Sequence, residues 1–103
     1  MRKVEVSLHG EVAAVLIEYD QNHYSLEYLD AYNGDPISRA LPASSLIYEF
    51  DHFPAFFDGL LPEGLQLQYL LKSMKIDEDD YMSQLIAIGD DFVGAISVRE
   101  LVE

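Results

Sequence analysis

Three histidines are the first candidates for chemistry in this chain, because imidazole ligates metals and exchanges protons near neutral pH. They are His9, His23 and His52. No two of them are four residues apart, as a helical ligand pair would be, and the chain has no Cys to complete a zinc site. The spacing therefore predicts structural or solvent-facing histidines, with no metal and no cofactor.

Two acidic runs are the next candidates, since carboxylates bind calcium and carry out acid–base catalysis. The run DEDDYMSQL, residues 77–85, lacks the central Gly and the terminal Glu of a calcium loop. Its first residue, Asp77, suits a helix N-cap, with Asp80 three residues later. GDDFVG, residues 89–94, is one residue too long to be the Asp-Phe-Gly motif of kinases. Its two adjacent carboxylates are expected to point in different directions, which does not suit paired acid–base catalysis. A phosphate-binding loop, a catalytic loop and a serine-hydrolase elbow are all missing, so we expect a protein that is not an enzyme.

Charge restricts the partners of the chain. Its 103 residues include six Lys or Arg against nineteen Asp or Glu, a net charge of -13. Such a surface repels nucleic acid and anionic lipid and favours a protein with a basic surface, although solubility alone also explains it. The first ten residues alternate charged and apolar side chains and fit neither a secretory signal nor a membrane span. We therefore expect a cytoplasmic protein with no membrane or direct nucleic-acid contact.

The first half of the chain has the two-residue period of β-strands. Val4, Val6 and Leu8 alternate with polar residues, and His9-Gly10 can form a two-residue hairpin turn. A run before Pro42 suits a short edge strand. The expected strands in this half are residues 4–8, 12–19, 23–29 and 37–41.

The second half changes to a helical period of about 3.6 residues. We expect helices over residues 53–61, from about Pro62 to Met74, and from the Asp77 cap to a C-terminal Gly89, followed by a strand through residues 95–98. The fold predicted for residues 1–103 is one α+β domain: a small antiparallel sheet, made of an N-terminal meander and a C-terminal strand, packed with about three short helices. The stripe expected to face the core from the second helix is Leu67, Leu70, Leu71 and Met74.

Leu65 follows a Pro-Glu-Gly corner between the first two expected helices. At about 100° per residue it lies roughly 180° from Met74 and roughly 160° from Leu67, so it points away from the apolar stripe. Tyr69 is its i+4 neighbour on the same outward side. An outward Leu–Tyr pair is typical of a small protein-binding knob, but Leu65 can also fold back onto Phe56 or Phe57.

Two runs in the second half resemble a bacterial protein family. FFDGLLPEG, residues 56–64, and LIAIGDDFVGAISV, residues 85–98, stand in this order. They are similar to the Phe-Phe-Asp-x-Leu-Leu-Pro and Ile-Gly-x-Asp-x-Val-Gly-Ala runs of the N-terminal subdomain of HipA-type serine/threonine kinases. With the strand-rich first half, the resemblance covers nearly the whole chain.

This resemblance implies binding rather than catalysis. In HipA-type kinases the subdomain is joined to a kinase core, whereas a free-standing version resembles the HipS family of tripartite HipBST toxin–antitoxin systems. There, HipS-type proteins bind and neutralise a HipT-type kinase toxin, and the HipB-type component binds DNA. The resemblance therefore implies an antitoxin with a HipT-like serine/threonine kinase as its partner and a HipB-like protein as a further component of a ternary complex.

The same resemblance implies where binding occurs. In the family, the residue that follows Glu-Gly, after the Leu-Leu-Pro run, enters or covers the active-site region of the kinase. In this chain that residue is Leu65; relatives often have Trp there, and this chain contains none. The implied partner-binding residues are Asp58, Pro62, Glu63, Gly64, Leu65, Gln66 and Tyr69.

Two other hypotheses stay open at this point. The chain could act as a non-catalytic assembly module that stabilises the kinase and bridges it to a HipB-like repressor. It could also be a piece of a longer HipA-type protein. Substitution of Leu65 separates the first hypothesis from inhibition, because a bridge does not depend on a residue inserted at the active site.

Overall fold

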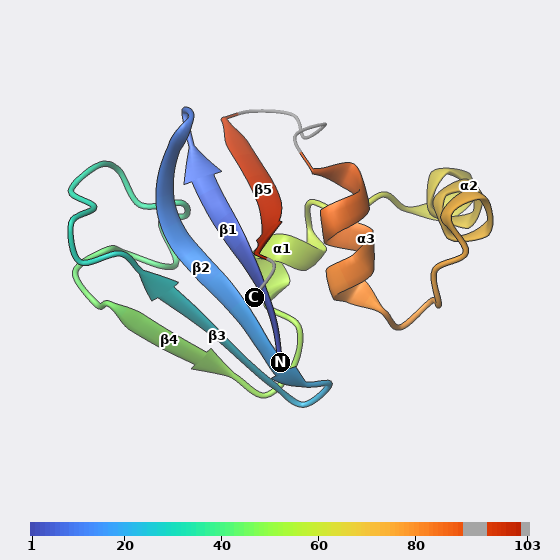
Figure 1. Cartoon of the computed structure of the whole chain (residues 1–103), viewed down its shortest axis with the longest axis horizontal. Helices are drawn as coiled ribbons and strands as arrows, with labels where there is room; N and C mark the ends of the chain where they lie inside the picture. Colours follow the sequence, from blue (N-terminus) through green and yellow to red (C-terminus); the bar gives the residue numbers. More distant parts are fainter. Residues whose placement is uncertain (90–94, 102–103) are drawn as a thin grey trace.

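A computed structural model describes residues 1–89 and 95–101, which form a five-stranded antiparallel sheet with three helices on one side (Figure 1). The strand order is β4-β3-β2-β1-β5. The predicted α+β fold is confirmed. The elements are β1 Arg2–Leu8, β2 Glu11–Asp20, β3 His23–Tyr28, β4 Ile47–Phe50, α1 Ala55–Asp58, α2 Gly64–Met74, α3 Tyr81–Ile88 and β5 Ile96–Leu101.

The N-terminal meander forms as its alternating pattern predicts. His9 and Gly10 connect β1 to β2 with positive φ angles of 52° and 83°, as a primed hairpin turn requires. Val4 and Val6 are buried on the face that the helices cover. The final strand β5 pairs antiparallel with β1, so the C-terminal part of the chain closes one side of the sheet.

The edge strand lies elsewhere than expected. Residues 37–41 form a loop rather than a strand. The Tyr28 hydroxyl accepts from the Ile37 amide and donates to the Leu41 carbonyl, so these two backbone groups bond to a side chain instead of to a neighbouring strand. The side chains of Ile37 and Leu41 are nevertheless buried in the core. The edge strand is β4, which follows this loop and pairs with β3.

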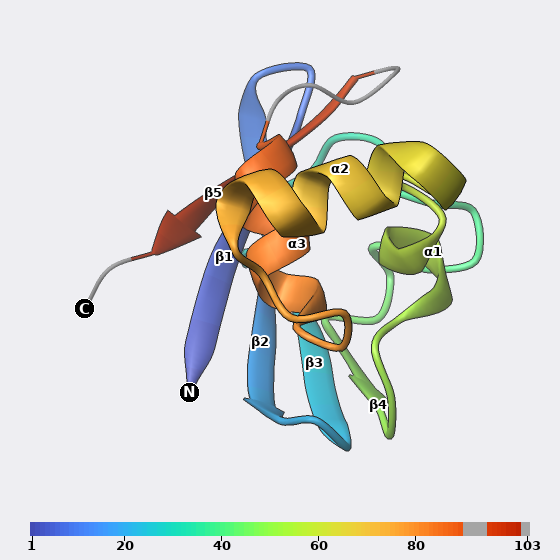
Figure 2. The same ribbon diagram turned by 90° about the vertical axis from the view of Figure 1, so that its right-hand side faces the viewer.

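The helices form two layers over one face of the sheet. Helices α1 and α3 lie against the sheet, and α2 lies outside α3, as the two perpendicular views show (Figures 1 and 2). Helix α1 is shorter than the predicted 53–61, because Pro54 precedes its first turn and Gly59 ends it. Phe53, Phe57 and Leu61 still share one face and are buried in the core, to which α3 contributes Met82 and Leu85.

A polar network joins the start of α3 to β1. The cap is Asp80 rather than the predicted Asp77, because the Asp80 carboxylate accepts from the Ser83 amide (3.2 Å) and hydroxyl (2.7 Å). Arg2 donates from Nη1 to the same carboxylate and from Nη2 to the Ser83 hydroxyl, each at 2.8 Å. Burial raises the pKa of Asp80, but the hydrogen bonds from Ser83 and the Arg2 guanidinium outweigh burial and hold that pKa below its ordinary value.

The lowered pKa of Asp80 predicts an acid-dependent contribution to stability. Asp80→Asn keeps a capping side chain but loses the charge, so at pH 7 it should lower the free energy of unfolding by about 1 kcal/mol. Stabilisation by a carboxylate with a lowered folded-state pKa is present above the ordinary carboxyl pKa and lost as the pH falls through the folded-state pKa. Urea unfolding from pH 7 to pH 2 should therefore show the two proteins converging in acid. Exposed Asp79→Asn is the matched control, and a constant difference at all pH values would contradict the network.

The buried Phe57 ring predicts a large cavity effect. Phe57→Ala should lower the free energy of unfolding by about 3 to 5 kcal/mol, because the side chain is fully buried. Half-buried Phe56→Ala removes the same atoms from the neighbouring position and should cost clearly less. Urea midpoints at constant slope measure both, and equal losses would show that α1 does not orient its two rings as described.

Candidate functional site

The corner between α1 and α2 depends on one glycine. Glu63 is extended, and Gly64, the first residue of α2, has a positive φ of 60°. A Cβ at Gly64 would meet nothing within 4 Å, so the glycine is needed for its backbone angle rather than for space. Pro62 lies before the helix and not in its first turn as predicted, since the helix starts at Gly64.

Leu65 points into solvent. Its side chain is 88% exposed, and that of Tyr69 is 77% exposed. The predicted outward direction is confirmed, and Leu65 does not fold back onto Phe56 or Phe57. The two side chains lie one turn apart, so together they form a small apolar surface next to the corner.

The opposite face of α2 is less well packed than predicted. Leu67, Leu70 and Leu71 are only half-buried, Met74 is 56% exposed, and no residue of α2 is buried. The expectation that this stripe faces the core is therefore wrong. Figure 2 shows α2 outside α3, so α3 lies between α2 and the sheet. Helix α2 thus packs mainly on α3.

A groove lies below the corner, where the segment between α1 and α2 approaches the start of α3. Its volume is about 200 Å³. Three of the predicted site residues, Asp58, Pro62 and Glu63, line it. Gln66 is exposed on the surface of α2. Leu61, Leu67, Glu78, Tyr81 and Gln84 complete the lining.

No local pattern in the sequence predicts the α3 side of this groove. Glu78, Tyr81 and Gln84 approach the corner only through the packing of α2 on α3. Gln84 is buried although it is polar, because its amide donates to the carbonyls of Asp77 and Glu78. These two bonds hold the segment before α3 against the groove.

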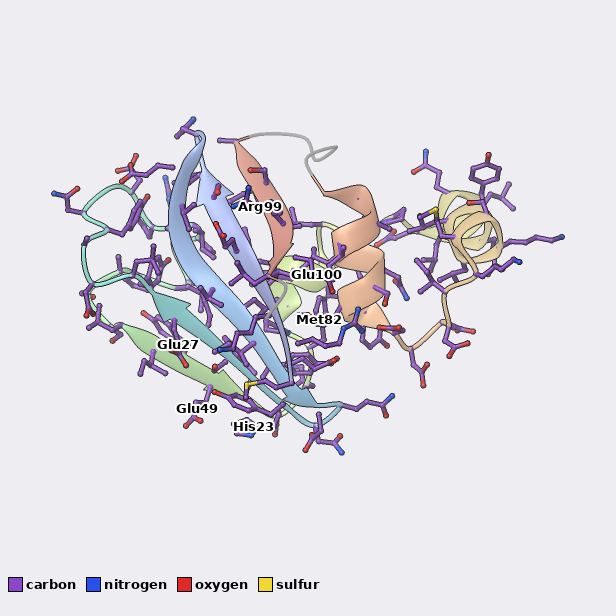
Figure 3. All side chains as sticks on the ribbon, viewed as in Figure 1. His23, Glu27, Glu49, Met82, Arg99 and Glu100 are labelled. Atoms are coloured by element: carbon purple, nitrogen blue, oxygen red, sulfur yellow. The ribbon has the colours of Figure 1, made fainter. Side chains whose placement is uncertain are left out.

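The other candidate residues lie away from the corner. His23 and Glu49 come together at the edge of the sheet with a distance of 3.2 Å between Nε2 and Oε1 (Figure 3), and His52 contacts Asp51. Within residues 1–89 and 95–101, no three His, Cys, Asp or Glu side chains are arranged to hold a metal ion. The acidic pair at 90–91 falls outside the described residues. None of the described helices is long and apolar enough to cross a membrane.

Comparison with known proteins decides the family. The model of the HipA N-terminal domain matches residues 4–99. The chain belongs to the HipA N-terminal domain family. An uncharacterized protein of Haemophilus influenzae is 32% identical over 101 residues, which are 97% of this chain and 93% of that protein. A solved structure described as the N-terminal domain of HipA toxin superposes with a TM-score of 0.78 and 27% identity, covering all of this chain and 95% of the other.

Membership in this family confirms the predicted resemblance and makes the chain a HipA-related module. The HipA N-terminal domain is a non-catalytic subdomain. The match extends through both sequence runs and through the sheet, so the corner is part of the shared domain. The exposed Leu65 surface thus belongs to a HipA-related module.

The exposure of Leu65 predicts that its replacement leaves the fold intact. Leu65→Asp should change the free energy of unfolding by less than about 0.5 kcal/mol, as surface substitutions do. Leu61→Asp places the same carboxylate four residues earlier at a side chain that is only 8% exposed, and should lower stability by several kcal/mol. Thermal unfolding followed by circular dichroism compares the two. A large loss for Leu65→Asp would contradict the outward direction of the corner.

Proposed function

We propose that this protein is an antitoxin that binds and neutralises a HipT-like serine/threonine kinase by inserting the corner around Leu65 at the active site of the kinase. One observation carries the proposal: a HipA N-terminal domain presents an exposed Leu–Tyr pair on a helix with no buried residue. A helix with so little packing of its own has apolar surface available for a partner.

The geometry of the corner suits insertion. Leu65 follows Gly64 directly and stands on the first turn of α2, so little of the chain around it has to be ordered on binding. Complete burial of a Leu side chain contributes about 2 kcal/mol. An apolar side chain inserted between the lobes of a kinase prevents the closure that brings ATP, magnesium and substrate together. Inhibition by this route requires no chemistry from the inhibitor.

Charge supports the same partner. A kinase cleft that binds ATP presents basic residues, and a protein of net charge -13 is attracted to it over a long range. Such attraction mainly raises the association rate and makes binding sensitive to salt. Asp58 and Glu63 flank the corner and place part of this charge beside Leu65.

An assembly module that stabilises the kinase and bridges it to a HipB-like repressor is the second candidate. One observation favours it: a second group of exposed apolar side chains lies on and before β4, at the other end of the long axis from α2 (Figure 1). Leu46 is 48% exposed and Ile47 is 60% exposed. A bridge needs two separate contact surfaces, and these residues supply one that is distant from Leu65.

Titration of the cognate HipT-like kinase tests the proposal, with autophosphorylation from labelled ATP as the readout. The native chain should inhibit at an equimolar ratio, and Leu65→Asp should weaken inhibition about thirtyfold, which corresponds to the loss of one buried Leu. Leu65→Trp should retain inhibition, because it enlarges the apolar surface. Leu46→Asp introduces the same charge at the distant group and is the matched control.

Two results would contradict insertion at the active site. If Leu65→Asp binds and inhibits as the native chain does, the corner is not the inhibitory element. If all variants bind the kinase without changing its activity, the assembly role is the better explanation, and Leu46→Asp should then weaken capture of the HipB-like component.

A further inference from the structure

The groove below the corner combines apolar and acidic residues. Leu61, Pro62, Leu67 and Tyr81 line it together with Asp58, Glu63 and Glu78. The three acidic residues come from three different segments of the chain and are exposed. No Lys, Arg or His is among the lining residues.

These three carboxylates lack internal counter-charges. In the described part of the chain, Asp58, Glu63 and Glu78 make no ion pair and no side-chain hydrogen bond. Other acidic side chains do pair, as Asp80 does with Arg2 and Glu5 with Arg99. In a chain of net charge -13, carboxylates left unpaired around one groove repel each other, and a cationic group from outside would relieve that repulsion.

The residues around the groove favour an arginine side chain over a metal ion. Within the described residues the carboxylates do not form a group that can hold a metal ion, so they do not converge as metal ligands do. A guanidinium is larger and planar, and it carries five N–H donors that reach separate carboxylates. The apolar lining residues suit the methylene stem of an arginine. The Tyr81 ring stacks on Phe53 and also lines the groove, where a guanidinium can contact it.

We infer that this groove is the docking site for an arginine side chain of the protein partner, next to the contact made by Leu65. The inference rests on the proposed function for the identity of the partner as a kinase. Leu67 lines the groove from the face of α2 opposite to Leu65, and Glu63 lines it two residues before Leu65, so the groove and the Leu–Tyr pair lie on different faces of α2 next to the same corner. Leu65 supplies the apolar contact, and the groove supplies a charged contact that fixes its orientation.

A double variant that neutralises two carboxylates tests whether the groove contributes to binding of the partner. Glu63→Gln with Glu78→Gln keeps the size of both side chains and should weaken binding to the cognate HipT-like kinase about tenfold at physiological salt. Glu11→Gln with Glu100→Gln removes the same charge from exposed positions outside the groove and should change binding less than twofold. Surface plasmon resonance measures both, and thermal unfolding confirms that both variants fold.

A small probe tests the groove without the kinase. Capped arginine, N-acetyl-arginine N-methylamide, should shift the amide NMR signals of Leu67, Tyr81 and Gln84 in the native chain. It should not shift them in the Glu63→Gln/Glu78→Gln variant. Capped citrulline, which has nearly the same shape without the charge, should shift neither protein.

The outcomes separate the groove from the proposed function. Equal losses of kinase affinity for both double variants would show that only the overall charge matters and would overturn the proposed arginine site. Native binding that survives the groove variant would do the same while leaving the antitoxin proposal intact. If the native chain does not bind the kinase, the proposed function fails, and the NMR titration alone decides: signals that shift with capped arginine support the groove, and unchanged signals overturn it.

Discussion

The space that α3 occupies determines how the rest of this protein is exposed. The sheet has one face covered by helices. Both α1 and α3 lie against it; α3 contributes Met82 and Leu85 to the core, and Arg2 and Asp80 bind its first turn to β1. Helix α2 then packs on α3 rather than on the sheet, and its residues stay half-buried or exposed. An incompletely packed helix at one end of the molecule is thus a direct consequence of how the core is filled.

The spacing of apolar residues predicted those elements whose formation depends only on residues close together in the sequence. The β1–β2 hairpin needs only alternating side chains and a turn with positive φ at His9 and Gly10. The edge strand could not be assigned in this way, because a contact distant in sequence decides it. Tyr28 binds the backbone of the 37–41 segment and leaves Ile47–Phe50 to pair with β3. The cap of α3 is Asp80 rather than the predicted Asp77 for a similar reason: Arg2, which is distant in the sequence, binds the Asp80 carboxylate.

The candidate site shows the same division. The direction of Leu65 follows from the angle between successive helical residues, and the structure confirms it. The degree of burial of Leu70 and Met74 does not follow from that angle, because it depends on which element α2 contacts. The groove could not be predicted from local patterns at all. Its acidic residues come from segments before and after α2, and the Gln84 amide binds the backbone of the segment that carries Glu78. Local patterns therefore identify a surface residue, while packing creates the concave surface beside it.

Leu65 also limits how the proposed binding can work. A Trp at the same corner would bury more apolar area and serve as a larger anchor, so a Leu leaves more of the affinity to other contacts. Tyr69 can supply part of it, since it is exposed on the same side of α2. Apolar contacts alone fix orientation poorly, whereas paired charges fix it through geometry and reject partners of the wrong sign. A corner with a small apolar tip and an acidic groove would therefore gain its specificity from charge, with apolar burial as the smaller share.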